Sequence, residues 1–202
     1  MTASALPPTE LVTGVSDGMG GFERIGERLV HHGAVVSFYE RTFSAPDGSV
    51  VVRDVVVHPG AVSVVPVDDE GRIILVRQYR AAIEAEMWEI PAGKLDIDGE
   101  DLEVAARREL AEEVGVTAGS LVRLVSFHNS PGFCDELQHT YLATELTHVG
   151  NDLQGVEEEH MTTGRWTFDD ALTAIADGTI TDAKTIIGIQ LAAIRLAPPG
   201  AR

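Results

Sequence analysis

Apolar and β-branched residues recur in short runs through the first half of the chain, and these runs predict strands. Turn residues separate the runs: Ser-Ala-Pro-Asp-Gly at 44–48 predicts a hairpin, and Asp-Asp-Glu-Gly at 68–71 predicts a second tight turn. The strands expected from this pattern cover residues 34–43, 49–57, 62–67, 73–79 and 88–90.

The period of the apolar positions changes in the second half. Between residues 101 and 114 they fall at helical spacing, and Gly115 follows as a C-terminal stop. After this helix we expect strands at 121–127, 137–143 and 164–168, then helices at 169–176 and 182–196, the last capped by Thr181 or Asp182. This order predicts an α+β fold in which a mixed β-sheet is sandwiched between helices, an α/β/α arrangement.

One domain accounts for the length of the chain. A chain of 202 residues buries a self-sufficient core, and neither a repeat nor an internal linker divides it. Residues 1–21 are rich in Pro, Gly, Ser and Thr, so we expect a flexible tail there and a single domain over 22–202.

The net charge limits the classes of partner that the protein is expected to bind. A formal net charge of −17 repels phosphate backbones and disfavours nucleic-acid binding. A small polyanionic substrate is repelled for the same reason unless cations bridge it to the protein, which points to a metal.

The number of cysteines and the length of the apolar runs indicate the cellular location. Cys134 is the only cysteine, so no intrachain disulfide forms, and the histidines lack the spacing of a zinc site. The first residues do not resemble a secretory signal, and no apolar run reaches the roughly 20 residues of a membrane span. We expect a cytoplasmic protein with no membrane partner.

The predicted helix at 101–114 carries three glutamates, Glu109, Glu112 and Glu113, whose spacing places them on one face. Their mutual repulsion and the negative end of the helix dipole both make this arrangement unfavourable. One interpretation is a solvated acidic face paired with Arg107 and Arg108. The other is a site for a hard divalent cation, Mg²⁺ or Mn²⁺, which prefers carboxylate oxygens and reverses the repulsion.

The residues around these glutamates resemble the signature of the Nudix hydrolase family: Gly, five residues, Glu, seven residues, then Arg-Glu-apolar-x-Glu-Glu-x-Gly-apolar. Here Glu100 is followed by seven residues and then by Arg-Glu-Leu-Ala-Glu-Glu-Val-Gly-Val at 108–116, which matches every specified position. The loop departs from the pattern, because six residues, not five, separate Gly93 from Glu100.

Segments outside the signature are similar to the ADP-ribose pyrophosphatase branch of this family. They are Arg-Asp-Val-Val-Val-His-Pro-Gly-Ala-Val at 53–62, Gln-Tyr-Arg at 78–80, Trp-Glu-Ile-Pro-Ala-Gly at 88–93 and Ser-Pro-Gly-Phe at 130–133. Pro131 also stands 16 residues after Gly115, as a proline does in that branch. The resemblance implies a Nudix fold, hydrolysis of ADP-ribose to AMP and ribose 5-phosphate, and a homodimer that shares its N-terminal strands.

The resemblance also assigns roles near the metal. Glu109 and Glu113 are the expected metal ligands, followed by Glu112, with the backbone carbonyl of Ala92 as a further ligand and Arg108 orienting the glutamates. The base is expected on a loop after the signature. Among residues 157–159 we choose Glu158, and Glu136 is the second candidate.

The substrate contacts are expected outside the helix. Arg80, at the end of a predicted strand, is the expected phosphate-binding residue, with Arg53 and Arg77 as weaker candidates. Glu89 contacts the ribose or base, or instead pairs with an arginine. Trp88 and Phe133 are core residues or, less favoured, stack on the ligand.

Two other functions stay open. The signature specifies only the pyrophosphate, so another nucleoside diphosphate sugar, such as GDP-mannose, is an alternative substrate. A ligand sensor without turnover is the second alternative, although the glutamates are intact and the chain shows no basic recognition helix.

Overall fold

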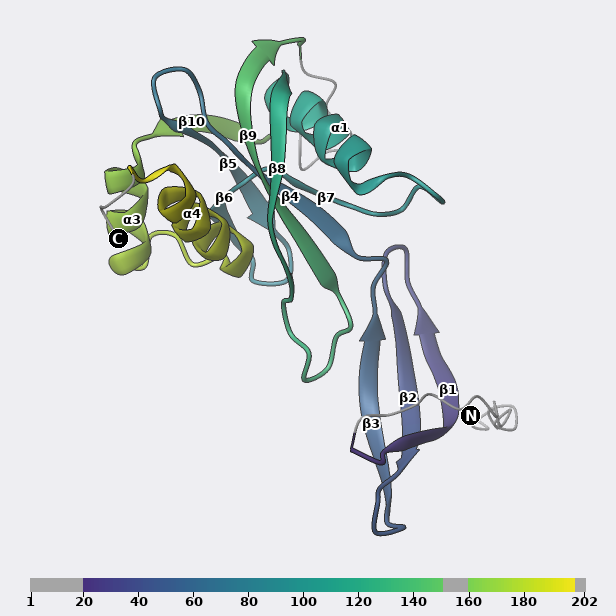
Figure 1. The fold of residues 1–202 in the computed structure, drawn as a ribbon. Helices are drawn as coiled ribbons and strands as arrows, with labels where there is room; N and C mark the ends of the chain where they lie inside the picture. Colours follow the sequence, from purple (N-terminus) through teal and green to yellow (C-terminus); the bar gives the residue numbers. More distant parts are fainter. Residues whose placement is uncertain (1–19, 151–159, 199–202) are drawn as a thin grey trace. The chain divides into compact units, whose positions relative to one another are not determined.

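The computed structural model describes residues 20–150 and 160–198 (Figure 1). The chain folds as two compact units, whereas the sequence predicted one domain. Among the described residues, the first unit comprises 20–59 and 130–136, and the second comprises 60–129, 137–150 and 160–198. Most of the predicted tail, residues 1–19, and the acidic segment 151–159 lie outside the described residues.

The first unit is an antiparallel sheet of β1 (Glu23–His32), β2 (Ser37–Ser44) and β3 (Val50–Val57), in the order β1-β2-β3. The predicted hairpin turn joins β2 to β3. A hydrogen bond from the backbone N–H of Ala45 to the carbonyl of Ser49 closes it. Residues 130–136 return to this sheet, and Cys134 bridges to Val56 of β3.

The second unit contains two sheets, with strand orders β10-β5-β6 and β7-β4-β9-β8. Their strands are β4 (Ala61–Pro66), β5 (Ile73–Arg80), β6 (Ala85–Glu89), β7 (Ala92–Lys94), β8 (Val116–His128), β9 (Leu137–His148) and β10 (Thr162–Trp166). The β4–β9 pair is parallel and the other pairs of this unit are antiparallel, so its strands are mixed in direction.

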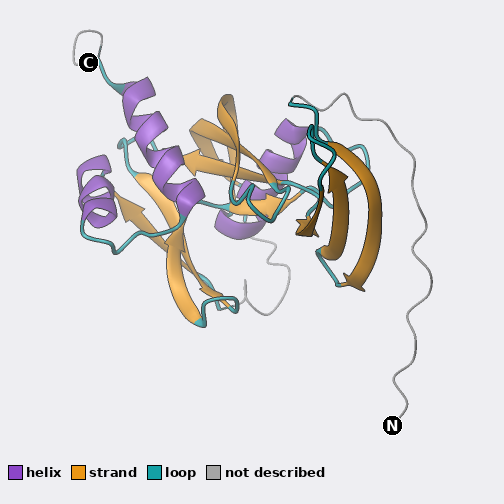
Figure 2. Ribbon diagram, turned by 90° about the horizontal axis from the view of Figure 1, so that it is seen from below, coloured by secondary structure: helices purple, strands orange, loops and turns teal. Residues whose placement is uncertain are grey.

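Helices cover both faces of these strands. Figure 1 shows α1 (Leu102–Val114) on one side of the second unit, with α3 (Phe168–Ala176) and α4 (Ala183–Leu196) on the other. The same helices are purple in Figure 2, with the strands between them. The predicted α/β/α sandwich is therefore confirmed. No helix among the described residues is long and apolar enough to cross a membrane.

Successive side chains of β4 and β5 point to opposite faces, so these strands divide the core into two parts. Val62 and Val64 pack beneath α1 with Leu110, whereas Val65 faces α4 with Ile189. Both faces of these strands are thus buried, which explains why β4 is apolar at nearly every position and lacks the polar alternation of a half-exposed strand.

The predicted elements are found with shifted ends, and two strands were not predicted. β8 begins at Val116, five residues before the predicted start at 121, because its first residues pair with the distal end of β9. β1 is rich in charged residues, and β7 is a three-residue strand that exists through its pairing with β4.

Local signals determine both ends of α1. Asp101 is the N-cap, and its side chain accepts from the backbone N–H of Glu103. Gly115 ends the helix in the left-handed region, with φ 66° and ψ 30°, and its N–H donates to Ala111 O.

We expect Gly115→Ala to lower the free energy of unfolding by about 1 kcal/mol, because an L side chain is strained at this φ. Gly132→Ala is the matched control: Gly132 has no left-handed φ, and an added methyl group there meets only open space. The control is expected to be neutral or slightly stabilising. Urea unfolding of both variants measures the difference, and equal stabilities would contradict the left-handed cap.

Candidate active site

The three glutamates of α1 differ in burial. Glu109 and Glu113 are 7% and 3% exposed, whereas the Glu112 side chain is 21% exposed. A solvated acidic face would leave all three in water, so this interpretation does not fit Glu109 and Glu113. Burial of two carboxylates on one helix face is costly without compensating partners.

β7 supplies one side of this site. The backbone N–H of Ala92 donates to Glu113 Oε2 at 3.0 Å. A Cβ atom added to Gly93 would stand 1.8 Å from the Glu109 Cδ, so only glycine fits beside that carboxylate. The peptide of Ala92 and the two buried glutamates are therefore neighbours, as the metal assignment requires.

Arg108 links the glutamates to the loop before the helix. Its Nε and Nη2 donate to the two carboxylate oxygens of Glu100, both at 3.0 Å, and its Nη1 donates to Glu109 at 2.7 Å and Glu112 at 3.0 Å. The hydrogen bonds to Glu100 raise the pKa of Arg108, with further contributions from the charges of Glu109 and Glu112. Arg108 thus makes the ion pairs expected of an orienting residue, and the pair with Glu112 is one of three.

The additional residue between Gly93 and Glu100 does not displace Glu100 from Arg108. The loop closes in a turn in which the N–H of Glu100 donates to the carbonyl of Ile97, and Gly99 adopts a φ of 75°. The length of the loop thus departs from the signature. Glu100, at the end of the loop, still binds Arg108 on the helix that carries the other glutamates.

The donor set suits a hard divalent cation. Glu109 and Glu113 present carboxylate oxygens beside the Ala92 peptide, and oxygen donors are what Mg²⁺ and Mn²⁺ prefer. Among residues 20–150 and 160–198, no three His, Cys, Asp or Glu side chains converge in the geometry of a complete metal site. Arg108 provides compensating positive charge beside Glu109 and Glu112.

A second ionic cluster surrounds Glu89, which is 1% exposed. Arg80 donates to both of its oxygens, from Nε at 2.7 Å and from Nη2 at 2.6 Å, and the Lys184 ammonium donates to Oε2. Burial opposes ionisation of Glu89, but these hydrogen bonds and the two positive charges hold its pKa below the ordinary value. Of the two roles expected for Glu89, ion pairing with an arginine is the one observed.

Two other predicted residues of the second unit, Arg77 and Trp88, contact neighbours on its strands. Arg77 pairs with Glu86 at 2.8 Å and lies over the Trp88 ring, with its Cζ 5.9 Å from the ring centroid. Trp88 meets Trp166 edge-on, with ring centroids 5.3 Å apart, at the margin of the core beneath α3 and α4. Trp88 is therefore a partly buried residue that packs against the core from its edge.

Three predicted residues lie in the first unit. Arg53 is exposed on β3 and donates to the carbonyl of Val52, and Phe133 is 58% exposed, so its core interpretation was wrong. Glu136 Oε1 stands 3.9 Å from His58 Nδ1. The first-choice base, Glu158, lies outside the described residues with its two neighbours.

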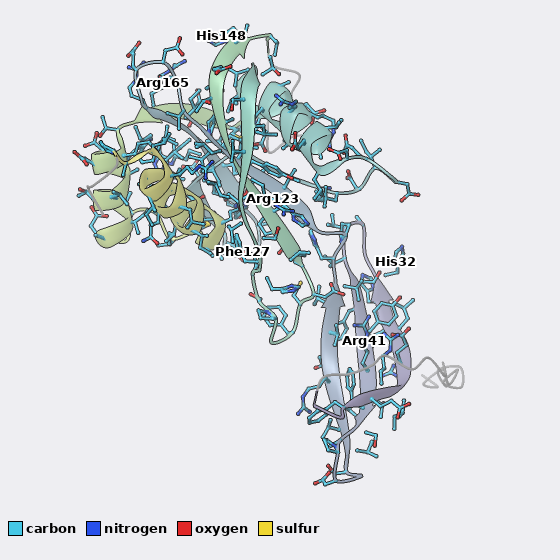
Figure 3. The ribbon with its side chains drawn as sticks, in the orientation of Figure 1. His32, Arg41, Arg123, Phe127, His148 and Arg165 are labelled. Carbon is cyan, nitrogen blue, oxygen red and sulfur yellow. The ribbon has the colours of Figure 1, made fainter. Side chains whose placement is uncertain are left out.

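Two surface hollows of the second unit lie away from these residues. One of about 520 Å³ lies by the β4–β5 turn, between Asp68, Arg72, His148 and Arg165. Figure 3 labels His148 and Arg165 at this end of the second unit. None of the predicted site residues lines it, so its size is no guide to the active site.

Sequence reasoning missed Lys184 and Thr185, whose hydroxyl oxygen accepts from the N–H of Ile90 at 2.9 Å. The only available signal was the predicted cap at Asp182, which the structure confirms. That cap gives the start of α4 but does not indicate which strand the first turn meets.

The lowered pKa of Glu89 predicts a pH dependence of stability. Its ionised form stabilises the fold fully above the unfolded pKa of about 4.3, and this contribution is lost as pH falls through the lower folded pKa. Glu89→Gln should be roughly 3–5 kcal/mol less stable at neutral pH, because it removes one partner of a buried ionic cluster. Urea unfolding from pH 7 to 3 measures the difference in free energy of unfolding between wild type and Glu89→Gln. This difference should narrow below about pH 4.3. A difference that stays constant with pH would contradict a stabilising, ionised Glu89.

The chain is similar to known proteins over most of its length. The NUDIX domain matches residues 57–186. The ADP-ribose pyrophosphatase of Bacillus subtilis (strain 168) is 41% identical over 166 residues, 82% of this chain and 89% of that protein. The ADP-ribose pyrophosphatase of Mycobacterium tuberculosis (strain ATCC 25618 / H37Rv) is 40% identical over 168 residues, 83% of this chain and 81% of that protein.

A solved structure shares the fold. The crystal structure of an ADP compounds hydrolase aligns with a TM-score of 0.77 and 24% identity, covering 90% of this chain and 97% of its own. At this identity the likeness concerns the fold alone. With the domain match and the two relatives, it leads to one conclusion: the chain belongs to the Nudix hydrolase family.

Proposed function

We propose that the protein hydrolyses the pyrophosphate bond of ADP-ribose, giving AMP and ribose 5-phosphate. The observation that carries this proposal is the likeness to two ADP-ribose pyrophosphatases over more than four-fifths of each chain. Glu109 and Glu113, buried on α1 beside β7, are consistent with pyrophosphate chemistry.

The proposed reaction depends on Mg²⁺, with Mn²⁺ as a substitute. Glu109 and Glu113 would hold the ion, with Glu112 and the carbonyl of Ala92 as further ligands. When bound, the ion neutralises negative charge on the pyrophosphate and lowers the pKa of a coordinated water. Arg108 restrains Glu109 and Glu112 by its ion pairs, and the N–H of Ala92 restrains Glu113.

Arg80 is the proposed phosphate-binding residue. Glu89 occupies one edge of its guanidinium, while 42% of the Arg80 side chain is exposed. A planar fork of donors held in one orientation suits a phosphate oxygen. Glu158 is the proposed base that removes a proton from the attacking water, and Glu136 is the second candidate.

A homodimer is part of the same proposal. Apolar side chains on the first unit face solvent, with Val50 60%, Leu29 50% and Val52 49% exposed. Exposed apolar residues gathered on one sheet are typical of a surface that binds another protein. A second copy of the chain, pairing through these N-terminal strands, would cover them.

A substrate panel tests the reaction. Purified protein with Mg²⁺ is offered ADP-ribose, GDP-mannose and other nucleoside diphosphate sugars, and the products are identified by mass. AMP with ribose 5-phosphate at the highest kcat/KM is the expected result. Preference for GDP-mannose would reassign the substrate, and no turnover of any compound would indicate a ligand sensor.

We expect Glu113→Gln to lower kcat at least about 100-fold with the fold intact, because loss of one metal ligand removes part of a stabilisation worth several kcal/mol. Glu103→Gln is the matched control, since Glu103 is an exposed residue in the first turn of the same helix. Turnover and Mg²⁺ titrations of both variants measure the effect. Wild-type turnover by Glu113→Gln at saturating metal would contradict the ligand assignment.

The choice of base predicts a different phenotype. Glu158→Gln should lower kcat about 100-fold or more with little change in the Mg²⁺ concentration needed for half-maximal rate, because a positioned base contributes about 10²–10⁴-fold. Glu157→Gln and Glu159→Gln are neighbouring controls with the same change in charge. If Glu136→Gln shows this phenotype and Glu158→Gln does not, Glu136 is the base.

A further inference from the structure

The first turn of α4 is directed into the second unit. Lys184 and Thr185 are 8% and 0% exposed, although they are the second and third residues of the helix after the N-cap Asp182. Asp182 accepts from the Thr185 N–H at 2.9 Å and from its hydroxyl at 2.6 Å. Lysine is rarely buried to this degree without an ionic partner, and here Asp182 lies 3.0 Å from the ammonium.

The other partner of Lys184 is Glu89, at the end of β6. One carboxylate oxygen of Glu89, Oε2, accepts from both the Lys184 ammonium and Nη2 of Arg80. With Asp182, these residues form a cluster of two cations and two anions. Lys184 approaches Glu89 from α4 and Arg80 approaches it from β5, so the carboxylate is held between two elements of the same unit.

The segment from residue 89 to residue 92 leads from this cluster to the glutamates of α1. Every residue of the segment is fixed by a hydrogen bond: Glu89 to Arg80 and Lys184, Ile90 N–H to Thr185, Pro91 O from the Val64 N–H, and Ala92 N–H to Glu113. The first turn of α4 therefore connects to the carboxylate site of α1 through four consecutive residues.

Glu89 also determines how Arg80 presents its charge. Its carboxylate occupies Nε and one Nη2 donor of Arg80, and the guanidinium has no other hydrogen-bond partner among residues 20–150 and 160–198. Hydrogen bonding to Glu89 raises the pKa of Arg80, and the charge of Glu113 adds a smaller contribution in the same direction. Among the α1 glutamates it is Glu113 whose charge acts on Arg80.

We propose that Lys184 is a positioning residue for the reaction: acting through Glu89, it fixes the guanidinium of Arg80 and the segment 89–92 beside the α1 glutamates. The proposal rests on the proposed function of Arg80 in binding the pyrophosphate. Lys184 itself is 8% exposed and directed at Glu89, so in this proposal it acts through Glu89 and not by direct contact with the substrate.

The first test compares Lys184→Met, which keeps the apolar stem, with Lys184→Arg, which restores the charge. Groups that orient metal ligands contribute about 10–100-fold, so we expect kcat/KM of Lys184→Met to fall about tenfold, mainly through KM, with partial recovery in Lys184→Arg. Arg195→Met is the control, because it removes one positive charge from the exposed last turn of the same helix. Wild-type KM in Lys184→Met would overturn the proposal.

A double-mutant cycle separates positioning from direct contact and from loss of folding. If Lys184 acts through Glu89, kcat/KM of Glu89→Gln/Lys184→Met equals that of Glu89→Gln within about twofold. The double variant also removes a buried cation and anion together, which favours a folded protein. Multiplicative losses would show that Lys184 acts independently of Glu89 and would overturn the proposal.

A spectroscopic readout makes the test independent of the substrate. The ¹⁵N-labelled Arg80 Nε–H resonance, protected from exchange by its bond to Glu89, should shift and exchange faster in Lys184→Met and remain unchanged in Arg195→Met. If wild-type protein does not hydrolyse ADP-ribose, the proposed function fails while this measurement still decides the positioning role. An unchanged resonance in Lys184→Met would contradict that role even in an active enzyme.

Discussion

The close approach of β7 to α1 is the constraint on which the candidate site depends. Gly93 leaves no room for a side chain beside Glu109, and the neighbouring peptide N–H binds Glu113. Two carboxylates are thereby buried against a backbone segment that also offers a carbonyl. Burial of like charges is unfavourable in a protein core, so the fold must compensate it with Arg108 and, in the proposed enzyme, with a cation.

The sequence predicted the parts of this site that local signals determine. The α1 helix has a capping aspartate, a C-terminal glycine and an apolar spacing, and its glutamates are placed by helical geometry alone. β7 was not predicted, because three residues of Ala-Gly-Lys carry no strand signal and become a strand only by pairing with β4. The same holds for β1, whose charged residues conceal its pairing with β2.

The partners of buried charges were the least predictable feature. Glu89 and Lys184 are separated by 95 residues, and nothing in either neighbourhood indicates the other. Arg80 was correctly expected at the end of a strand, but the sequence did not show that two of its guanidinium nitrogens bind Glu89. Phe133 was misjudged as a core candidate because its aromatic character is compatible with either environment, and the fold leaves it exposed. Composition gives the kind of chemistry, whereas tertiary structure determines which residues carry it.

The chain contains only two lysines, Lys94 and Lys184, and they differ strongly in exposure. The Lys94 side chain is 47% exposed on β7, whereas that of Lys184 is 10% exposed and ion-paired to Glu89 and Asp182. An amine-reactive reagent will therefore modify Lys94 rapidly and Lys184 only when the first turn of α4 opens. The labelling rate of Lys184 therefore reports local opening in this part of the fold, and the rate of Lys94 in the same chain is the reference for it.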